Sequence, residues 1–209
     1  MKVFEFAVDA YQAEWMLSPL RSKRESILLL MRTIKIMLLP ALPNPGTVGK
    51  VILRVDKMSR LFFVFDKKIF SINFPYVVTE VDGLLEFRSL HQAKIDSAFT
   101  SHVLSVLDMD ESFENREILN FADPISDICL FDADFWSLLR ELLMCEDGYI
   151  RFDHDDVRAD GRRHPVDHLD VFYSSGSTFK VGLDTSISHD VLCDLLDLNT
   201  DCHYLIRDK

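Results

Sequence analysis

Three short apolar runs separated by hairpin-length turns are the feature of this sequence that most constrains its fold. The runs cover residues 51–55, 61–65 and 69–74, and they are rich in the branched and aromatic side chains that favour strands. The polar segments between them are only three to five residues long. Connections of that length join neighbouring antiparallel strands, so we predict an antiparallel meander here.

The segment before this meander is predicted to be helical. Apolar residues recur at helical spacing over 5–18, and a Ser-Pro pair ends that pattern. Ser22, with Glu25 three residues later, predicts a capping box that begins a second helix, which continues through Leu39. Residues 40–49 then form a proline-rich connector.

The remaining chain is predicted to contain helices followed by strands. Residues 76–145 are interpreted as mostly helical, with a polar and acidic loop at 108–120. In the final third of the chain, apolar and polar residues alternate with the period of strands over 149–153, 168–173 and 178–183. Ser188 can then cap a closing helix.

We therefore predict one α+β domain over residues 1–209, with an antiparallel sheet and helices packed on one side of it. Residues 1–39 form an N-terminal helical pair, 40–49 the connector, and 50–209 the sheet and the other helices. The length and the 48% hydrophobic content are sufficient for a substantial core.

Charge is divided unevenly along the chain. Residues 1–70 hold 12 Lys and Arg against 6 Asp and Glu, a net charge of +6, whereas residues 71–209 hold 11 against 28, a net charge of −17. Because neutralising phosphates drives affinity for nucleic acids, only the basic N-terminal third could provide a nucleic-acid-binding surface. The acidic charge of residues 71–209 is consistent with three roles. This part of the chain can bind a basic protein partner, bind a metal ion, or simply form a well-solvated surface.

No sequence feature places the chain in a membrane. Its most apolar run, residues 27–39, contains two basic residues, and a span needs about 20 mostly apolar residues. The N-terminus lacks the charged-then-apolar layout of a signal peptide. The 4 cysteines show no C-x-x-C spacing, which disfavours a zinc ribbon or a redox pair. We expect a cytoplasmic protein with free thiols and no membrane partner.

Polar side chains from the last three predicted strands are expected on one face of the sheet. Side chains alternate along a strand, so the apolar residues of each strand face the core and the residues between them face away. The opposite face then carries Arg151, Asp153, His168, Asp170 and Lys180. His164 lies four residues before His168, where that strand begins.

Two metal-dependent interpretations of this cluster remain open. Carboxylates with imidazoles suit Mg²⁺, Mn²⁺ or Zn²⁺, and a bound ion could activate water against a phosphodiester. The candidate ligands are Asp153, Asp155, His164, His168 and Asp170, with Asp153, His168 and Asp170 as the central set. The candidate catalytic residues in these interpretations are His164, His168, Asp170 and Lys180. One class of nuclease uses an Asp on one strand and an acid-x-Lys motif on the next. Asp170 and Lys180 roughly fit the Asp and the Lys of this pattern, but the acid position, two residues before the Lys, is occupied by Thr178.

Two interpretations without a metal also remain open. The cluster can consist of cross-strand ion pairs, each worth about 0.2–1 kcal/mol. It can also bind an anion or a partner through Arg151, Asp153, Arg162 and Arg163, together with Lys180 and Arg158. Arg158, Arg162 and Arg163 lie in the charged loop 155–165. No complete motif for nucleotide hydrolysis, dinucleotide binding, zinc proteases or α/β-hydrolases occurs.

The C-terminal third resembles a bacterial domain-of-unknown-function family, number 2290. The likeness rests on Tyr-Ile-Arg-Phe-Asp-His-Asp from residue 149, on His-Pro-Val-Asp-His-Leu-Asp from residue 164, and on Thr-Phe-Lys-Val-Gly from residue 178. This resemblance implies a bacterial origin and an antiphage-defence setting, and it assigns no catalytic residue.

We therefore expect a non-enzymatic interaction component of a bacterial multi-protein system, acting in antiphage defence, without a cofactor. An operon-encoded protein would be its partner, docked on the basic N-terminus through Arg21, Lys23 and Arg24. The alternative is a metal-dependent nuclease or phosphodiesterase that uses the Asp153, His168 and Asp170 cluster and a divalent metal.

Overall fold

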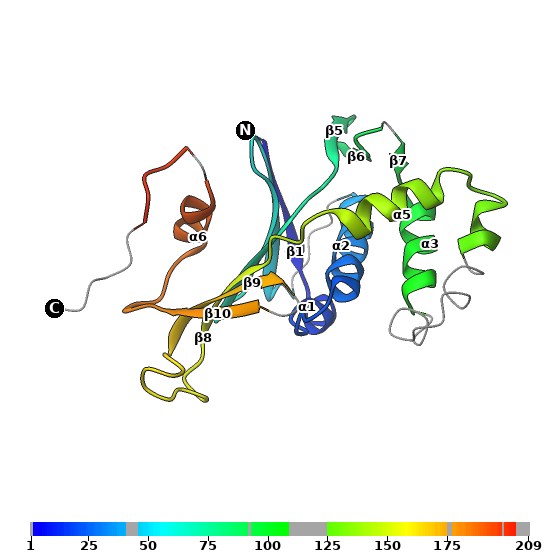
Figure 1. Cartoon of the computed structure of the whole chain (residues 1–209). Coiled ribbons are helices and arrows are strands. Elements are labelled where there is room, and N and C mark those ends of the chain that lie inside the picture. Colours follow the sequence, from blue (N-terminus) through cyan, green and yellow to red (C-terminus); the bar gives the residue numbers. More distant parts are fainter. Residues whose placement is uncertain are drawn as a thin grey trace. The chain divides into compact units, whose positions relative to one another are not determined.

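The protein is described by a computed structural model, and Figure 1 shows its helices and strands. The structure describes residues 2–40, 46–91, 93–108, 125–174, 177–197 and 199–203. It is an α+β protein with a seven-stranded antiparallel sheet, a three-stranded sheet and N-terminal helices, as predicted. The chain divides into two compact units. Unit 1 comprises Met1–Ala7, Val48–Ile72 and Gly148–Lys209, and unit 2 comprises Val8–Thr47 and Asn73–Asp147.

Unit 1 is built on the seven-stranded sheet, whose strand order is β1-β2-β3-β4-β8-β9-β10. Its strands are β1 (Lys2–Val8), β2 (Gly49–Val55), β3 (Ser59–Val64), β4 (Lys68–Asn73), β8 (Ile150–His154), β9 (Asp167–Ser174) and β10 (Ser177–Gly182). The meander predicted between residues 51 and 74 is confirmed as β2, β3 and β4. Strand β8 pairs antiparallel with β4, so the C-terminal strands extend this sheet.

One face of this sheet is covered by the C-terminal helix α6 (His189–Leu196). Ile52, Phe62, Phe152 and Leu169 form the sheet side of that core, and Leu192 from α6 is fully buried against them. The predicted cap is confirmed, since the Ser188 side chain accepts a hydrogen bond from the backbone N–H of Val191. This packing leaves the polar face of the C-terminal strands opposite α6.

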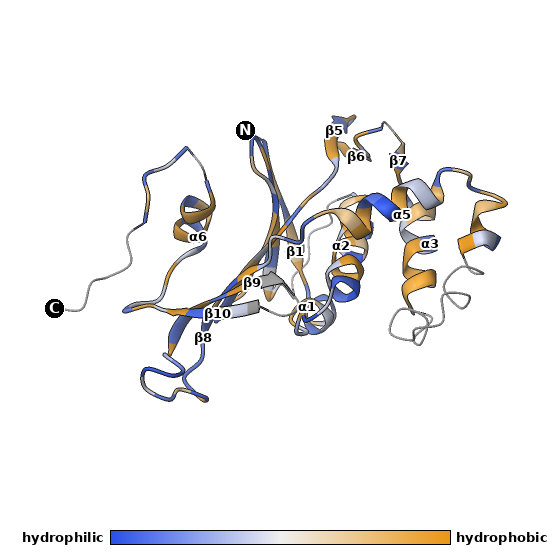
Figure 2. Ribbon diagram, viewed as in Figure 1, coloured by the Kyte–Doolittle hydropathy of each residue, from blue (hydrophilic) through white to orange (hydrophobic). Residues whose placement is uncertain are grey.

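Unit 2 contains the other helices and the small sheet. Its elements are α1 (Ala10–Met16), α2 (Lys23–Met37), β5 (Val77–Val81), β6 (Leu84–Arg88), β7 (Lys94–Ile95), α3 (Ser97–Asp108) and α5 (Phe135–Met144). The capping box predicted at Ser22 and Glu25 is present at the start of α2. Helix α2 packs against α3. The hydrophobic residues of α3 and α5 are interspersed with polar ones (Figure 2). In α2 all residues from Ser26 to Met31 are buried, which is more than one full turn of the helix.

Two helical predictions are wrong. Residues 2–8 form strand β1, and helix α1 begins only after Asp9, whose side chain accepts a hydrogen bond from Gln12 N–H. Residues 77–95 form β5, β6 and β7 instead of helix. Asp82 and Gly83 adopt positive φ angles of 52° and 78°, which is the conformation of a tight hairpin turn.

Parts of the predicted organisation lie outside the described residues. These are most of the acidic loop predicted at 108–120 and the centre of the connector at 40–49. The single-domain organisation over 1–209 stays a prediction. No helix in the described part of the chain is long and apolar enough to cross a membrane.

Candidate functional site

The register of β8, β9 and β10 brings the predicted polar residues together on one sheet face. Arg151 lies opposite Asp170, and Asp153 lies opposite His168. Lys180 on β10 also lies opposite Asp170. Strand alternation therefore predicted the shared face correctly. Residues two apart on one strand point to the same face, and residues directly opposite each other on paired strands also share a face.

Arg151 is the centre of this polar cluster. Its Nε donates to Asp153 Oδ2 at 2.7 Å, and its terminal nitrogens donate to Asp170 Oδ2 and to the Tyr149 hydroxyl. The Arg151 side chain is 20% exposed, against 13% for Asp153 and 21% for Asp170. Burial alone lowers the pKa of Arg151, but its contacts with Tyr149 and the two carboxylates raise that pKa above the usual value. One guanidinium thus holds both carboxylates in place.

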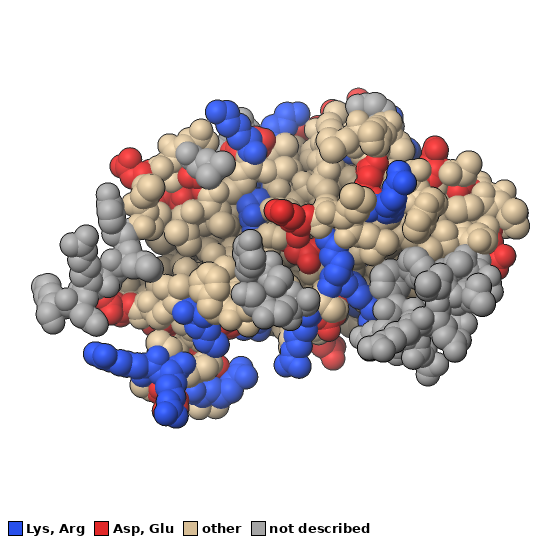
Figure 3. Space-filling view, viewed as in Figure 1, with Lys and Arg blue, Asp and Glu red and all other residues tan. Residues whose placement is uncertain are grey.

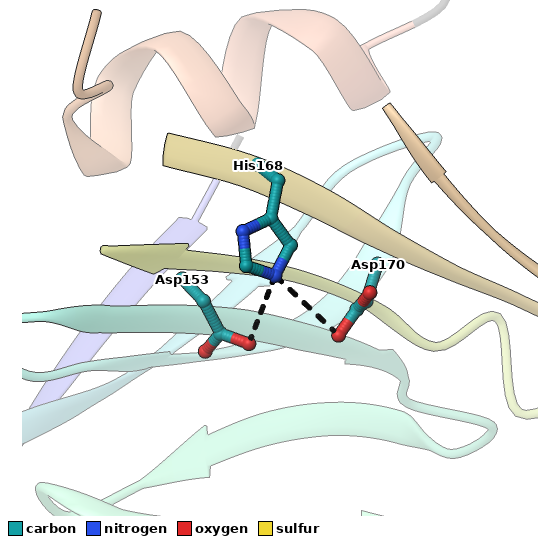
Figure 4. A group of neighbouring side chains, drawn as sticks. All are labelled: Asp153, His168 and Asp170. Carbon is teal, nitrogen blue, oxygen red and sulfur yellow. Dashed lines mark ion pairs between the residues drawn. The ribbon is translucent and has the colours of Figure 1, made fainter. Parts of the chain in front are cut away.

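His168 is fully buried and has a defined tautomer. Its Nδ1 lies 2.9 Å from the carbonyl oxygen of Pro165, which can only accept, so Nδ1 carries the proton. The other ring nitrogen, Nε2, faces the two carboxylates. Nε2 lies 3.8 Å from Asp153 Oδ2 and 4.0 Å from Asp170 Oδ2 (Figure 4). One ligand atom from each of these three residues lies within 4.8 Å of the others.

Lys180 provides the second cation of the cluster. Its Nζ lies 3.1 Å from Asp170 Oδ1 and 3.0 Å from His168 Nε2. His164 Nε2 is 3.3 Å from the same ammonium, and the two imidazole rings meet edge to face with centroids 4.7 Å apart. The ammonium of Lys180 therefore takes up the lone pair of His168 that a metal ion would otherwise use.

Ion pairs join the charges at the centre of this cluster. Arg151 contacts both Asp153 and Asp170, and Lys180 contacts Asp170. Lys68, on the neighbouring strand β4, lies opposite Asp153. Burial lowers the pKa of Lys68, and the charge of Asp153 opposes that shift. The cross-strand ion pairs and the three converging ligand atoms are thus present together.

The loop between β8 and β9 is charged and exposed. Asp155 is paired there with Arg158 at 2.9 Å, and it is not part of the three-ligand group. Arg162 and Arg163 are exposed, and His164 pairs with Asp160 as an isolated bridge. Figure 3 shows basic side chains gathered over this loop. The loop carries three arginines and three aspartates, and its exposed Arg162 and Arg163 are the cations that the anion-binding interpretation uses.

Three participants were missed in the sequence. Lys68 comes from the earlier meander, and Pro165 contributes only its carbonyl. Tyr149 is the first residue of the predicted strand 149–153 and alternates in step with Arg151, but it was not assigned to the polar face. Lys68 could have been found only by knowing that β4 pairs with β8, because the two strands are about eighty residues apart. The other two contacts depend on side-chain conformation.

The basic N-terminal residues are held by contacts within unit 2. Lys23 Nζ forms an ion pair with Asp147 at 2.8 Å, and Arg24 Nε donates to the carbonyl of Leu107 at 2.8 Å. Charge reversal at these positions would break internal contacts, so it cannot report cleanly on a partner. The role of this segment in docking stays a prediction.

A comparison with family models, with curated proteins and with solved structures finds no match for this chain. The resemblance of the C-terminal third to the domain-of-unknown-function family stays a prediction that these comparisons do not test.

Proposed function

We propose that the protein is a divalent-metal-dependent phosphodiesterase whose ion is held by Asp153, His168 and Asp170. The observation that carries the proposal is the convergence of three ligand atoms within 4.8 Å of one another. The hydrogen bond from His168 Nδ1 to Pro165 supports it, because metal-binding histidines usually donate their other ring N–H to a carbonyl or carboxylate.

Lys180 and Arg151 determine how such an ion would be accommodated. The ion must displace the Lys180 ammonium, which is feasible because the Lys180 side chain is 39% exposed and flexible. Arg151 stays between the carboxylates and reduces the charge available to the ion. We therefore expect weak binding that improves when one of these cations is removed.

The residues around the ion would supply the remaining chemistry. A bound divalent ion lowers the pKa of water and polarises a phosphoryl oxygen. Lys180, once displaced, lies beside the cluster and would stabilise negative charge developing on the phosphoryl group. His164, in contact with Lys180, would transfer a proton to or from the substrate.

Phosphate esters are the substrate class that the surroundings favour. The exposed Arg162 and Arg163 lie on the loop that leads into His164 and the cluster. Because residues 71–209 carry a net charge of −17, a long duplex would be repelled by most of the surface. A small or single-stranded phosphodiester is the better fit.

Metal binding is tested by calorimetry with Mn²⁺ on the whole protein. Asp170→Asn removes a ligand, and we expect affinity to fall at least about 100-fold. Lys180→Gln removes the competing ammonium, and we expect affinity to rise roughly tenfold. Lys67→Gln is the matched control, since Lys67 is 59% exposed and pairs with Asp156 in the loop. Absence of binding in both the wild type and Lys180→Gln would overturn the proposal.

Hydrolysis of bis-p-nitrophenyl phosphate by the same proteins separates binding from chemistry. We expect Mn²⁺-dependent turnover in the wild type and none in Asp170→Asn. Lys180→Gln should bind Mn²⁺ more tightly and yet turn over at least about tenfold more slowly. If Mn²⁺ binds without any turnover by the wild type, the site binds a metal but is not a phosphodiesterase.

The second candidate is the non-enzymatic interaction component, and exposed apolar residues of unit 2 favour it. Phe131 is 90% exposed, Leu130 78%, Met144 77% and Leu90 74%. Met144 lines a groove beside α5, and Leu90 lies between two residues that line the same groove, Ser89 and His91. Figure 2 shows the hydrophobic turn that precedes α5. Exposed apolar side chains of this kind are typical of surfaces that bind proteins.

Co-expression with operon-encoded proteins tests this candidate. We expect Phe131→Asp and Met144→Asp to reduce copurification of a specific partner by at least about tenfold. Val157→Asp is the matched control, because Val157 is 88% exposed but lies in unit 1. Equal recovery with all three variants would rule out this surface. The antiphage-defence setting depends on the family resemblance alone.

A further inference from the structure

A second group of reactive side chains lies on helix α6, on the opposite face of the sheet from the polar cluster. Cys193 Sγ is 3.7 Å from His189 Nε2, one helical turn away. The other ring nitrogen of His189, Nδ1, is 3.1 Å from Asp190 Oδ1. A thiol, an imidazole and a carboxylate are therefore in contact in the order that a nucleophile, its base and an orienting group require.

These residues line a cavity of about 400 Å³ within unit 1. Arg54 on β2 lines the same cavity as Cys193. Arg54 is held in place by Asp197 at 2.6 Å and by Asp56 at 3.1 Å. A reacting molecule in the cavity would thus meet the thiol, the imidazole and a fixed cation together.

The environment of Cys193 explains why it needs a base. Burial raises the pKa of the Cys193 thiol, and the contact with Arg54 only partly opposes that shift. The thiol is therefore protonated near neutral pH. His189 is the group positioned to accept its proton during attack on an electrophile.

We propose that Cys193, His189 and Asp190 form an acyl-transfer site in which Cys193 is the nucleophile. The cavity is lined by four carboxylates, of Glu5, Asp190, Asp194 and Asp197, and by two cations, Lys50 and Arg54. This excess of negative charge favours a thioester whose polar part is uncharged or cationic. The site is independent of the polar cluster, since none of its side chains is shared.

The step is a transthioesterification. Cys193 Sγ attacks the carbonyl carbon of the thioester while its proton passes to His189 Nε2. A bond forms between Cys193 sulfur and the acyl carbon, and the bond from that carbon to the leaving sulfur breaks. The proton held by His189 then passes to the leaving thiolate, so the thiol is released and no oxidant or reductant is needed.

Two of the other three cysteines, Cys145 and Cys202, serve as internal references. Cys202 is exposed, and Cys145 Sγ lies 3.6 Å from the ammonium of Lys23. Among the described residues, neither thiol forms a hydrogen bond with a histidine. Selective acylation of Cys193 over the exposed Cys202 therefore cannot follow from accessibility alone.

The experiment incubates the whole protein with acetylthiocholine, a cationic thioester, and locates acetyl groups by peptide mass spectrometry. We expect acetylation at Cys193, loss of that signal in Cys193→Ser, and a rate at least about tenfold lower in His189→Gln. Cys202→Ser is the control and should leave the rate at Cys193 unchanged. Acetylation of Cys202 but not Cys193 would overturn the proposal.

A pH profile separates a base from a structural residue. His189 also contacts the Phe62 ring, with centroids 5.2 Å apart, so its replacement could disturb packing. With iodoacetamide as the probe, alkylation of Cys193 in His189→Gln should be slow at neutral pH and approach the wild-type rate at strongly alkaline pH, where the thiol ionises without a base. Equal rates in both proteins across this range would refute the role of His189. A deficit in the variant that persists at high pH would also refute it.

Discussion

Replacing Arg151 with methionine is expected to destabilise the protein by about 3 kcal/mol. The change removes the guanidinium that neutralises both Asp153 and Asp170, whose side chains are 13% and 21% exposed. Two like charges would then lie close together in a poorly solvated place. Methionine keeps most of the volume of the side chain, so the loss reports mainly on charge.

The matched control for this prediction removes Arg151 and the two carboxylates together. The triple variant Arg151→Met, Asp153→Asn, Asp170→Asn leaves no carboxylate in the cluster, and the remaining ammonium of Lys180 is 39% exposed to solvent. We therefore expect this variant to recover to within about 1 kcal/mol of the wild type. Urea unfolding followed by circular dichroism, with hydrogen exchange of the β8 and β9 amides, measures both values. If the single variant is as stable as the wild type, Arg151 does not organise this face.

Truncation of Phe62 to alanine is expected to cost about 3–5 kcal/mol of stability. Phe62 is fully buried in the core between the sheet and α6, which it shares with Phe152 and Leu192. Loss of the ring leaves a cavity that strands on either side cannot close, because their hydrogen bonds hold them apart. The backbone amides of α6 should also exchange faster with solvent, which hydrogen exchange would detect.

Phe179→Ala is the control for this truncation. Phe179 belongs to the same unit, but it lies on the edge strand β10 and is 53% exposed. We expect its replacement to change stability by no more than about 1 kcal/mol. Equal losses from both variants would contradict the assignment of the core to the face under α6.

The polar face of the sheet was predictable because it follows from a local rule. Side chains alternate along a strand whatever the strand pairs with, so Arg151, Asp153, His168 and Asp170 had to share a face with Lys180 if the three strands joined one sheet. The meander of β2, β3 and β4 was predictable for the same reason, since short turns leave neighbouring strands no other partner.

The errors arose where two local patterns compete. The residues around β1 fit both a strand and the start of a helix, and the capping box at Asp9 decides between them. The hairpin of β5 and β6 lies in a segment predicted to be mostly helical, although the helical spacing there begins only at Phe99. The Asp-Gly pair at 82–83 was the available signal, as it is a strong marker of a tight turn.

The sequence by itself determined the strands of the C-terminal third, the alternation that collects five polar side chains on one face, and the caps of α2 and α6. Only the tertiary structure decided which of these side chains touch. The pairing of β10 with β9 sets Lys180 against Asp170, and the packing of α6 on the sheet places Arg54 and Cys193 in the lining of one cavity. Alternation is a property of the backbone of one strand. Contacts between distant segments depend instead on register and packing, which are set by the burial of the whole apolar face.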